Sequence, residues 1–107
     1  MHREALQKPG IKAVVEAVEE LCGLNQGGLA AAGRSFKMAE ARSMAVWAVR
    51  EMSDTTITEL GRTLGRDVTS LSSSITRLLA RVKDDHELAG RMQALKKILH
   101  DFAILQA

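Results

Sequence analysis

The stretch Thr56–Val82 constrains the fold of this 107-residue chain more than any other part of it. Thr56, with Glu59 three positions later, forms a capping-box pattern, which predicts the start of a short helix. Gly65-Arg66-Asp67 then predicts a tight turn, because glycine tolerates the left-handed backbone that ends many helices. A longer helix follows, with apolar residues at every third or fourth position. Together these signals outline a helix-turn-helix.

The two sides of the longer helix differ in chemistry. Its apolar stripe comprises Leu71, Ile75, Leu78, Leu79 and Val82. Its opposite face comprises Thr69, Ser70, Ser73, Thr76, Arg77 and Ala80. These outer side chains are small, mostly hydroxyl-bearing and free of negative charge, so the face can lie close to a DNA groove. We therefore take Arg66 in the turn, and Ser73 and Arg77 on the face, as candidate DNA contacts.

The whole sequence predicts an all-α fold, a compact helical domain of about five helices that spans residues 1–107. Aromatic residues make up only 3% of the chain, so aliphatic side chains and methionine must form the core. Residues 11–22, which follow Pro9, carry apolar side chains at helical spacing. Residues 37–52 do the same over most of the helix circumference, so we expect that helix to be central.

The C-terminal part predicts one more helix and an apolar tail. The helix is expected at about residues 85–100, after a cap at Asp84 or Asp85. The tail from Phe102 onward is expected to fold back onto the domain or to pack against another part of a longer protein. The helix-turn-helix itself is expected at about residues 56–82.

Positive charge gathers around the helix-turn-helix. Residues 34–83 hold 9 Lys and Arg against 5 Asp and Glu, whereas residues 1–33 and residues 84–107 each hold 3 against 4. This distribution favours a polyanionic partner, since neutralised phosphates supply most non-specific DNA affinity. The alternative is a chance fluctuation on a solvated surface.

The sequence carries no pattern for catalysis, cofactor binding or metal binding. Tyrosine is absent, and neither a phosphate-binding glycine loop nor a Gly-x-Ser-x-Gly motif occurs. His86 and His100 are separated by ~21 Å if they share a helix, which is too far for one metal ion. The longest uncharged run, residues 21–33, is too short and polar to span a bilayer. We expect a cytoplasmic protein that is not an enzyme and has no cofactor or membrane partner.

Two motifs within residues 58–70 resemble those of a known family. Thr58-Glu59-Leu60-Gly61 matches the opening of a short helix, and Gly65-Arg66-Asp67-Val68-Thr69-Ser70 the opening of a recognition helix. With them, residues 34–82 resemble the C-terminal DNA-binding domain of the bacterial chromosomal replication initiator, DnaA. In that family a basic loop precedes a long helix, and a helix-turn-helix follows. The resemblance implies sequence-specific DNA binding.

Carried over position by position, the resemblance implies roles for residues before the helix-turn-helix. Arg34 matches the basic-loop arginine that enters the minor groove. Arg42, Ser43 and Arg50 fall where side chains touch phosphates. These contacts would hold the domain on the duplex without reading its sequence.

The resemblance also implies roles within the helix-turn-helix. Ile57 and Thr58 fall where the start of the short helix meets the backbone of the duplex, where free amides favour an anion. Asp67, Thr69 and Ser70 fall on base-reading positions, where Asp accepts from cytosine and a hydroxyl donates or accepts. Val68 stands where the family motif has histidine, so we expect a preferred sequence that differs from the initiator's own.

A looser resemblance covers more of the chain. Transposases of the REP-associated single-tyrosine (HUH) type end in DnaA-like domains. Their ends resemble Leu64–Ser72, the acidic break Asp84–Leu88 and the tail Ala103–Ala107. This implies the DNA-binding domain of a transposase-related bacterial protein whose catalytic centre lies outside this chain. Its partners would be duplex or hairpin DNA and the rest of a larger transposase chain.

Other interpretations exist at several positions. Asp67 can be a helix cap, with or without base reading, and Arg34 can be an ordinary loop arginine. Arg50 can pair with Glu51 or Asp54. For the whole chain, the alternative is a helical protein–protein interaction module without DNA binding. The hydroxyl-rich second helix and the modest net charge of +2 favour that alternative.

Overall fold

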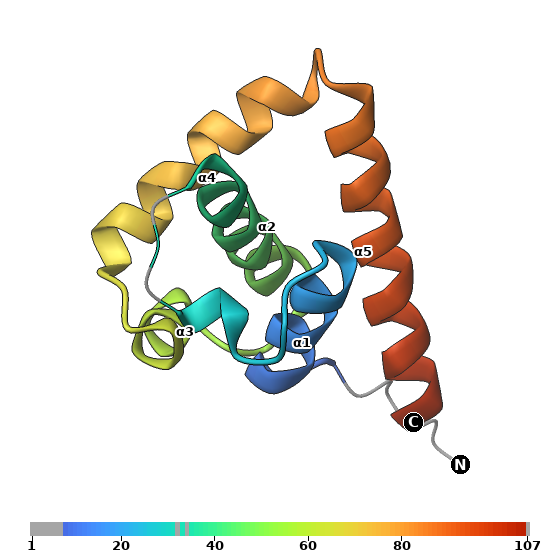
Figure 1. Ribbon diagram of the computed structural model, residues 1–107. Coiled ribbons are helices and arrows are strands. Elements are labelled where there is room, and N and C mark those ends of the chain that lie inside the picture. Colours follow the sequence, from blue (N-terminus) through green and yellow to red (C-terminus); the bar gives the residue numbers. More distant parts are fainter. Residues whose placement is uncertain (1–7, 32, 34, 107) are drawn as a thin grey trace.

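The helices lie close to where the sequence predicts them. The computed structural model describes residues 8–31, 33 and 35–106, and for residues 103–106 it describes the backbone alone. Within these residues five α-helices and one short 3-10 helix occur, without strands (Figure 1). They are α1 (Ile11–Leu21), η1 (Gly28–Ala30), α2 (Phe36–Met52), α3 (Ile57–Leu64), α4 (Val68–Val82) and α5 (His86–Gln106). The prediction of an all-α fold of about five helices is confirmed.

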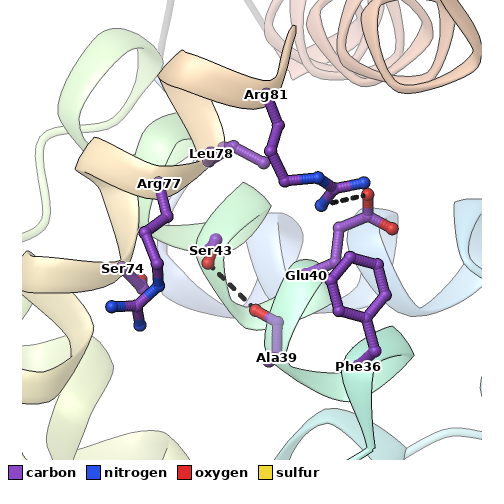
Figure 2. A pocket seen from close by; sticks show the side chains of 8 residues that line it. All are labelled: Phe36, Ala39, Glu40, Ser43, Ser74, Arg77, Leu78 and Arg81. Atoms are coloured by element: carbon purple, nitrogen blue, oxygen red, sulfur yellow. Dashed lines mark hydrogen bonds and ion pairs between the residues drawn. The ribbon is translucent and has the colours of Figure 1, made fainter. Parts of the chain in front are cut away.

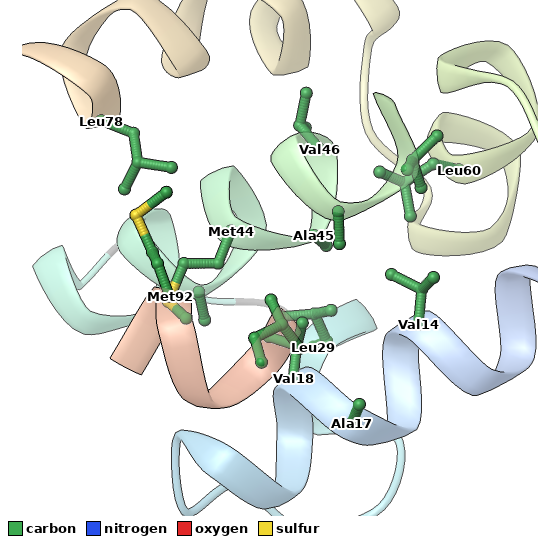
Figure 3. Close-up of a cluster of buried hydrophobic side chains, with 14 of the residues drawn as sticks. Val14, Ala17, Val18, Leu29, Met44, Ala45, Val46, Leu60, Leu78 and Met92 are labelled. Carbon is green, nitrogen blue, oxygen red and sulfur yellow. The ribbon is translucent and has the colours of Figure 1, made fainter. Parts of the chain in front are cut away.

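Helix α2 is the central element, as its apolar circumference predicts. It packs against α1, η1, α3, α4 and α5. Ala41, Met44, Ala45, Val46 and Ala48 of α2 are fully buried. Figure 3 shows Val14 and Val18 of α1 beneath α2, with Leu60 of α3 and Leu78 of α4 reaching the same cluster. The helix-turn-helix is therefore anchored to the core through α2.

Local signals set the ends of α3 and α4. The Thr56 hydroxyl accepts from the Glu59 amide at 3.1 Å, which caps α3. The Glu59 carboxylate does not complete the predicted capping box, because it accepts from the Thr55 hydroxyl at 2.9 Å. Gly65 ends α3 with a φ of 66°, a left-handed conformation that glycine adopts without strain. Asp67 caps α4 by accepting from the Ser70 amide at 3.2 Å.

Gly61 lets α3 and the turn approach each other closely. A Cβ atom placed there would lie 2.8 Å from the carbonyl oxygen of Arg66 and 3.3 Å from Cγ2 of Val68. The Gly61 carbonyl also accepts from the Arg66 amide at 2.9 Å. The absence of a side chain at position 61 thus fixes where α4 begins relative to α3.

Two further predictions need correction. Helix α5 is not finished at residue 100 but continues as backbone to Gln106, so the chain from Phe102 does not fold back as a separate tail. No glycine or proline interrupts this stretch, which allows the helix to continue. Leu79, expected inside, is 42% exposed, whereas the neighbouring Leu78 is buried, so Leu79 lies at the edge of the apolar stripe. Figure 1 shows α4 running on from there to the turn before α5.

Asp85 caps α5 by accepting from the Leu88 amide at 3.0 Å. This hydrogen bond is the largest of the effects that lower the pKa of the Asp85 carboxyl, and Arg81 nearby lowers it further.

In the part of the chain that the structure describes, no helix combines the length and apolarity needed to cross a bilayer.

Candidate nucleic-acid interface

The start of α4 presents an exposed polar edge. Asp67, Thr69, Ser70 and Ser73 are all exposed. The Asp67 carboxylate accepts from the Ser70 amide, and the Ser73 hydroxyl donates to the Thr69 carbonyl at 2.9 Å. Each of these hydrogen bonds stays within α4 and its cap. Since all four residues are exposed, no helix that the structure describes covers the edge. Leu71, on the opposite side, is buried in the core.

Arg77 extends this edge by one helical turn. It is exposed, and it forms no ion pair with any residue that the structure describes. In Figure 2 its side chain leaves α4 beside Ser74 and diverges from that of Arg81. A guanidinium in this position can reach a phosphate without first breaking an ion pair with a described carboxylate.

Arg50 has a similar environment at the end of α2. It lies in the last turn and is exposed. Within the described residues it pairs with neither Glu51 nor Asp54, and Asp54 instead lies 3.7 Å from the Lys8 ammonium. The geometry therefore does not support the alternative in which a neighbouring carboxylate neutralises Arg50.

The start of α3 is more mixed. Thr58 is exposed, whereas Ile57 is half-buried and packs against the core. The first turn already receives a cap from Thr56, which occupies the Glu59 amide. Thr58 is thus the more accessible of the two residues expected to meet a duplex backbone.

Arg42 and Ser43 occupy interior positions. Arg42 is 8% exposed and Ser43 is 6% exposed. The Ser43 hydroxyl donates to the Ala39 carbonyl one turn earlier, at 2.9 Å (Figure 2). Burial lowers the pKa of the Arg42 guanidinium, and the positive charge of Arg66 lowers it further. The structure places neither Arg42 nor Ser43 on the surface where a phosphate could be met.

Arg66 faces the protein. It is half-buried, and its guanidinium donates to the carbonyls of Leu64, Gly65 and Ala31 at 3.3, 3.3 and 3.0 Å. The expectation for Arg34 lies outside the described residues. The geometry thus brings together Asp67, Thr69, Ser70, Ser73 and Arg77 along α4, but it does not add Arg42, Ser43 or the Arg66 guanidinium to that exposed edge.

Sequence reasoning missed an ion-pair cluster at the C-terminal end of α4, where that helix meets α2 and α5. Glu40 of α2 lies 3.1 Å from Arg81 and 2.9 Å from Arg91. Arg81 also pairs with Asp85 at 3.1 Å. Its guanidinium lies 4.5 Å from the centre of the Phe36 ring, and Figure 2 shows it between this ring and Glu40 on one side and α4 on the other. The only signal in the sequence was the spacing of Arg81 and Asp85, which is typical of a helical ion pair.

Comparison with known proteins agrees with this geometry. The sequence model described as bacterial dnaA protein helix-turn-helix matches residues 11–78, which is more than half of the chain. Domains of that family bind DNA and are not catalytic. No curated protein sequence matches the chain. The family match begins at α1 and so covers more of the N-terminal part than the resemblance in the motifs alone.

Proposed function

The chain belongs to the bacterial DnaA helix-turn-helix family, and from that premise we propose that it binds double-stranded DNA in a sequence-dependent way through the start of α4. The observation that carries the proposal is the exposed polar edge at Asp67, Thr69, Ser70 and Ser73. The Asp67 carboxylate and the Ser73 hydroxyl hydrogen-bond within α4 and its cap, to the Ser70 amide and the Thr69 carbonyl. An edge without a covering element can enter the major groove, as recognition helices do.

Affinity and sequence preference come from different residues in this proposal. Arg50 and Arg77 supply phosphate contacts, because both are exposed and neither is neutralised by a described carboxylate. Thr58 contributes at the start of α3. Thr69 and Ser70 read base edges, since hydroxyls donate and accept and the threonine methyl can contact thymine.

The test is in-vitro selection from a random duplex library that also contains hairpins, read at two salt concentrations. We expect an enriched sequence and binding that weakens steeply as salt rises. Thr69→Ala should change the selected sequence, with each good base contact contributing ~1–3 kcal/mol. Arg50→Ala should weaken binding to all sequences alike and flatten the salt dependence. Absence of salt-sensitive binding to duplex or hairpin DNA at low ionic strength would refute the proposal.

A protein–protein interaction module is the second candidate. Phe36 at the start of α2 is 66% exposed, and Leu79 and Ile98 are also exposed. If these side chains form one contiguous patch, it would suit a protein interface. The selection experiment separates the two candidates, because an interaction module would enrich no DNA sequence.

The relation to REP-associated transposases stays a prediction. If the chain is the terminal domain of such a protein, the selected DNA should include a hairpin, and a longer parent chain should carry a catalytic tyrosine upstream of α1. Selection of plain duplex DNA without hairpins would remove the support for this relation.

A further inference from the structure

The loop before α2 is held in place by side chains from several distant elements. The Glu19 carboxylate of α1 accepts from the Leu29 amide at 3.0 Å. Arg42 of α2 donates from Nε to the Leu29 carbonyl at 3.0 Å and from Nη1 to the Gly33 carbonyl at 3.0 Å. Leu29 is fully buried. The described part of this loop is thus anchored at both ends.

Two guanidiniums meet on one carbonyl in the middle of the loop. Arg42 Nη2 donates to the Ala31 oxygen at 2.7 Å, and Arg66 Nη2 donates to the same oxygen at 3.0 Å. Arg42 comes from the central helix, whereas Arg66 comes from the turn between α3 and α4. This shared acceptor directly connects the loop to the helix-turn-helix. Two like charges approach each other here, which is one cause of the lowered pKa of Arg42.

Arg66 is itself rigidly placed. Its amide donates to the Gly61 carbonyl at 2.9 Å, and its own carbonyl occupies the space where a side chain at position 61 would lie. The backbone of Arg66 therefore belongs to the α3–α4 turn, while its guanidinium belongs to the loop. A lysine could not reproduce the arrangement, because one ammonium cannot reach three carbonyls in the fixed geometry of a guanidinium.

We propose that Arg66 is a positioning residue: by holding the Ala31 carbonyl it fixes the α3–α4 turn against the loop before α2, and so places the polar edge of α4 where it meets DNA. The inference rests on the proposed DNA-binding function. It gives Arg66 and Arg42 an indirect role: their positive charges are used on backbone carbonyls and not on phosphates. Asp67, the cap of α4, directly follows Arg66, so a shift of the turn moves the polar edge.

The experiment compares Arg66→Ala and Arg66→Lys with Arg50→Ala in the full chain, using the duplex chosen by selection. We expect Arg66→Ala to weaken binding about tenfold while leaving the slope of log K against log salt unchanged. Arg50→Ala, which removes an exposed charge, should lower that slope by about 0.9. Arg66→Lys keeps the charge but loses the hydrogen bonds to the three carbonyls. Its DNA affinity should therefore resemble that of Arg66→Ala. Thermal unfolding identifies variants that lose binding only because they no longer fold.

A double-mutant cycle supplies the second readout. Arg42→Ala and Arg66→Ala both act on the Ala31 carbonyl, so their combined effect on DNA affinity should fall well short of the product of the single effects. The effects of Arg50→Ala and Arg66→Ala on DNA affinity should instead multiply, as expected for independent sites. A slope that drops by about one for Arg66→Ala, together with full rescue by Arg66→Lys, would overturn the inference and make Arg66 a phosphate contact. Failure of the unaltered chain to bind any DNA would instead refute the proposed function itself, and with it the positioning role.

Discussion

The two ends of α4 use their polar side chains in different ways. At the N-terminal end, Asp67, Thr69 and Ser73 are exposed, and the Asp67 carboxylate and the Ser73 hydroxyl hydrogen-bond within the helix and its cap. At the C-terminal end, Arg81 is bound to Glu40 and Asp85 and lies over the Phe36 ring. One end is available to a partner, whereas the other fastens α4 to α2 and α5.

This difference changes how the charge of the chain is interpreted. The excess of Lys and Arg in residues 34–83 suggests a broad basic surface. However, Arg42, Arg66 and Arg81 use their guanidiniums on internal acceptors. The exposed arginines Arg50, Arg62 and Arg77 remain for a partner. Formal charge therefore overstates the charge that can reach DNA.

The largest effect is expected at Glu40. Its carboxylate, 10% exposed, faces two arginines that are each about one-third exposed. The contact with Arg81 is an ion pair without hydrogen-bond alignment. Glu40→Ala should lower the free energy of unfolding by about 2–3 kcal/mol, since it leaves the partly buried Arg91 without its carboxylate partner and Arg81 with Asp85 alone. Urea unfolding measures the loss. The salt dependence of DNA binding by the folded variant should be unchanged, and a changed slope would place the cluster within the interface.

The next largest effect is expected at Gly61, which sets the angle at which α4 begins. Gly61→Ala should cost about 1–3 kcal/mol of folding free energy, because the new methyl group meets the Arg66 carbonyl. DNA affinity should also fall. Gly90→Ala is the matched control, since Gly90 lies in α5 with open space around it. It should stabilise the protein by about 0.5–1 kcal/mol and leave binding unchanged. Equal effects of the two substitutions on unfolding would contradict the close approach at Gly61.

Two substitutions at Asp67 distinguish its role as a helix cap from a role in base reading. Asp67→Ala should lower the free energy of unfolding by about 1 kcal/mol, because the Ser70 amide loses its acceptor. Asp67→Asn keeps a capping oxygen and should retain most of that stability. If Asp67 also accepts from a base, Asp67→Asn should change the sequence obtained by selection. An unchanged sequence would leave Asp67 as a cap alone.

The smallest effect in energy is expected at Arg77, but it contrasts the two ends of α4 most directly. Arg77→Gln should reduce the slope of log K against log salt by about 0.9 and leave thermal stability nearly unchanged. Arg81→Gln should do the reverse, since its charge serves Glu40 and Asp85. Fluorescence anisotropy at several salt concentrations measures both slopes. Similar slopes for the two variants would contradict the division of α4 into a binding end and a fastening end.

The elements that sequence predicts well are those set by neighbouring residues. Thr56, Gly65 and Asp67 end or begin helices through contacts within a few positions, and these were identified from pattern alone. The apolar stripe of α4 likewise predicts its contact with α2, except at its exposed edge near Leu79. Local chemistry of this kind is readable because its partners lie in the same short stretch of sequence.

The contacts that sequence did not predict join distant residues. Arg42 reaches carbonyls 9 to 13 positions away, Arg66 reaches one 35 positions away, and Glu40 meets Arg91 across 51 positions. Nothing in the local pattern distinguishes a buried arginine from an exposed one. A resemblance at Arg42 and Ser43 suggests phosphate contacts, yet only the packed fold determines whether a side chain reaches the surface.

The most direct test of the account is to follow the backbone amides by heteronuclear NMR while the selected duplex is added. We expect the largest shift changes at residues 66–70 and at Ser73 and Arg77, with smaller changes at the start of α3, and we expect the changes to diminish as salt is raised. The amides of α5 should change little. Large changes centred on α5, or none that depend on salt, would contradict the assignment of DNA binding to the start of α4.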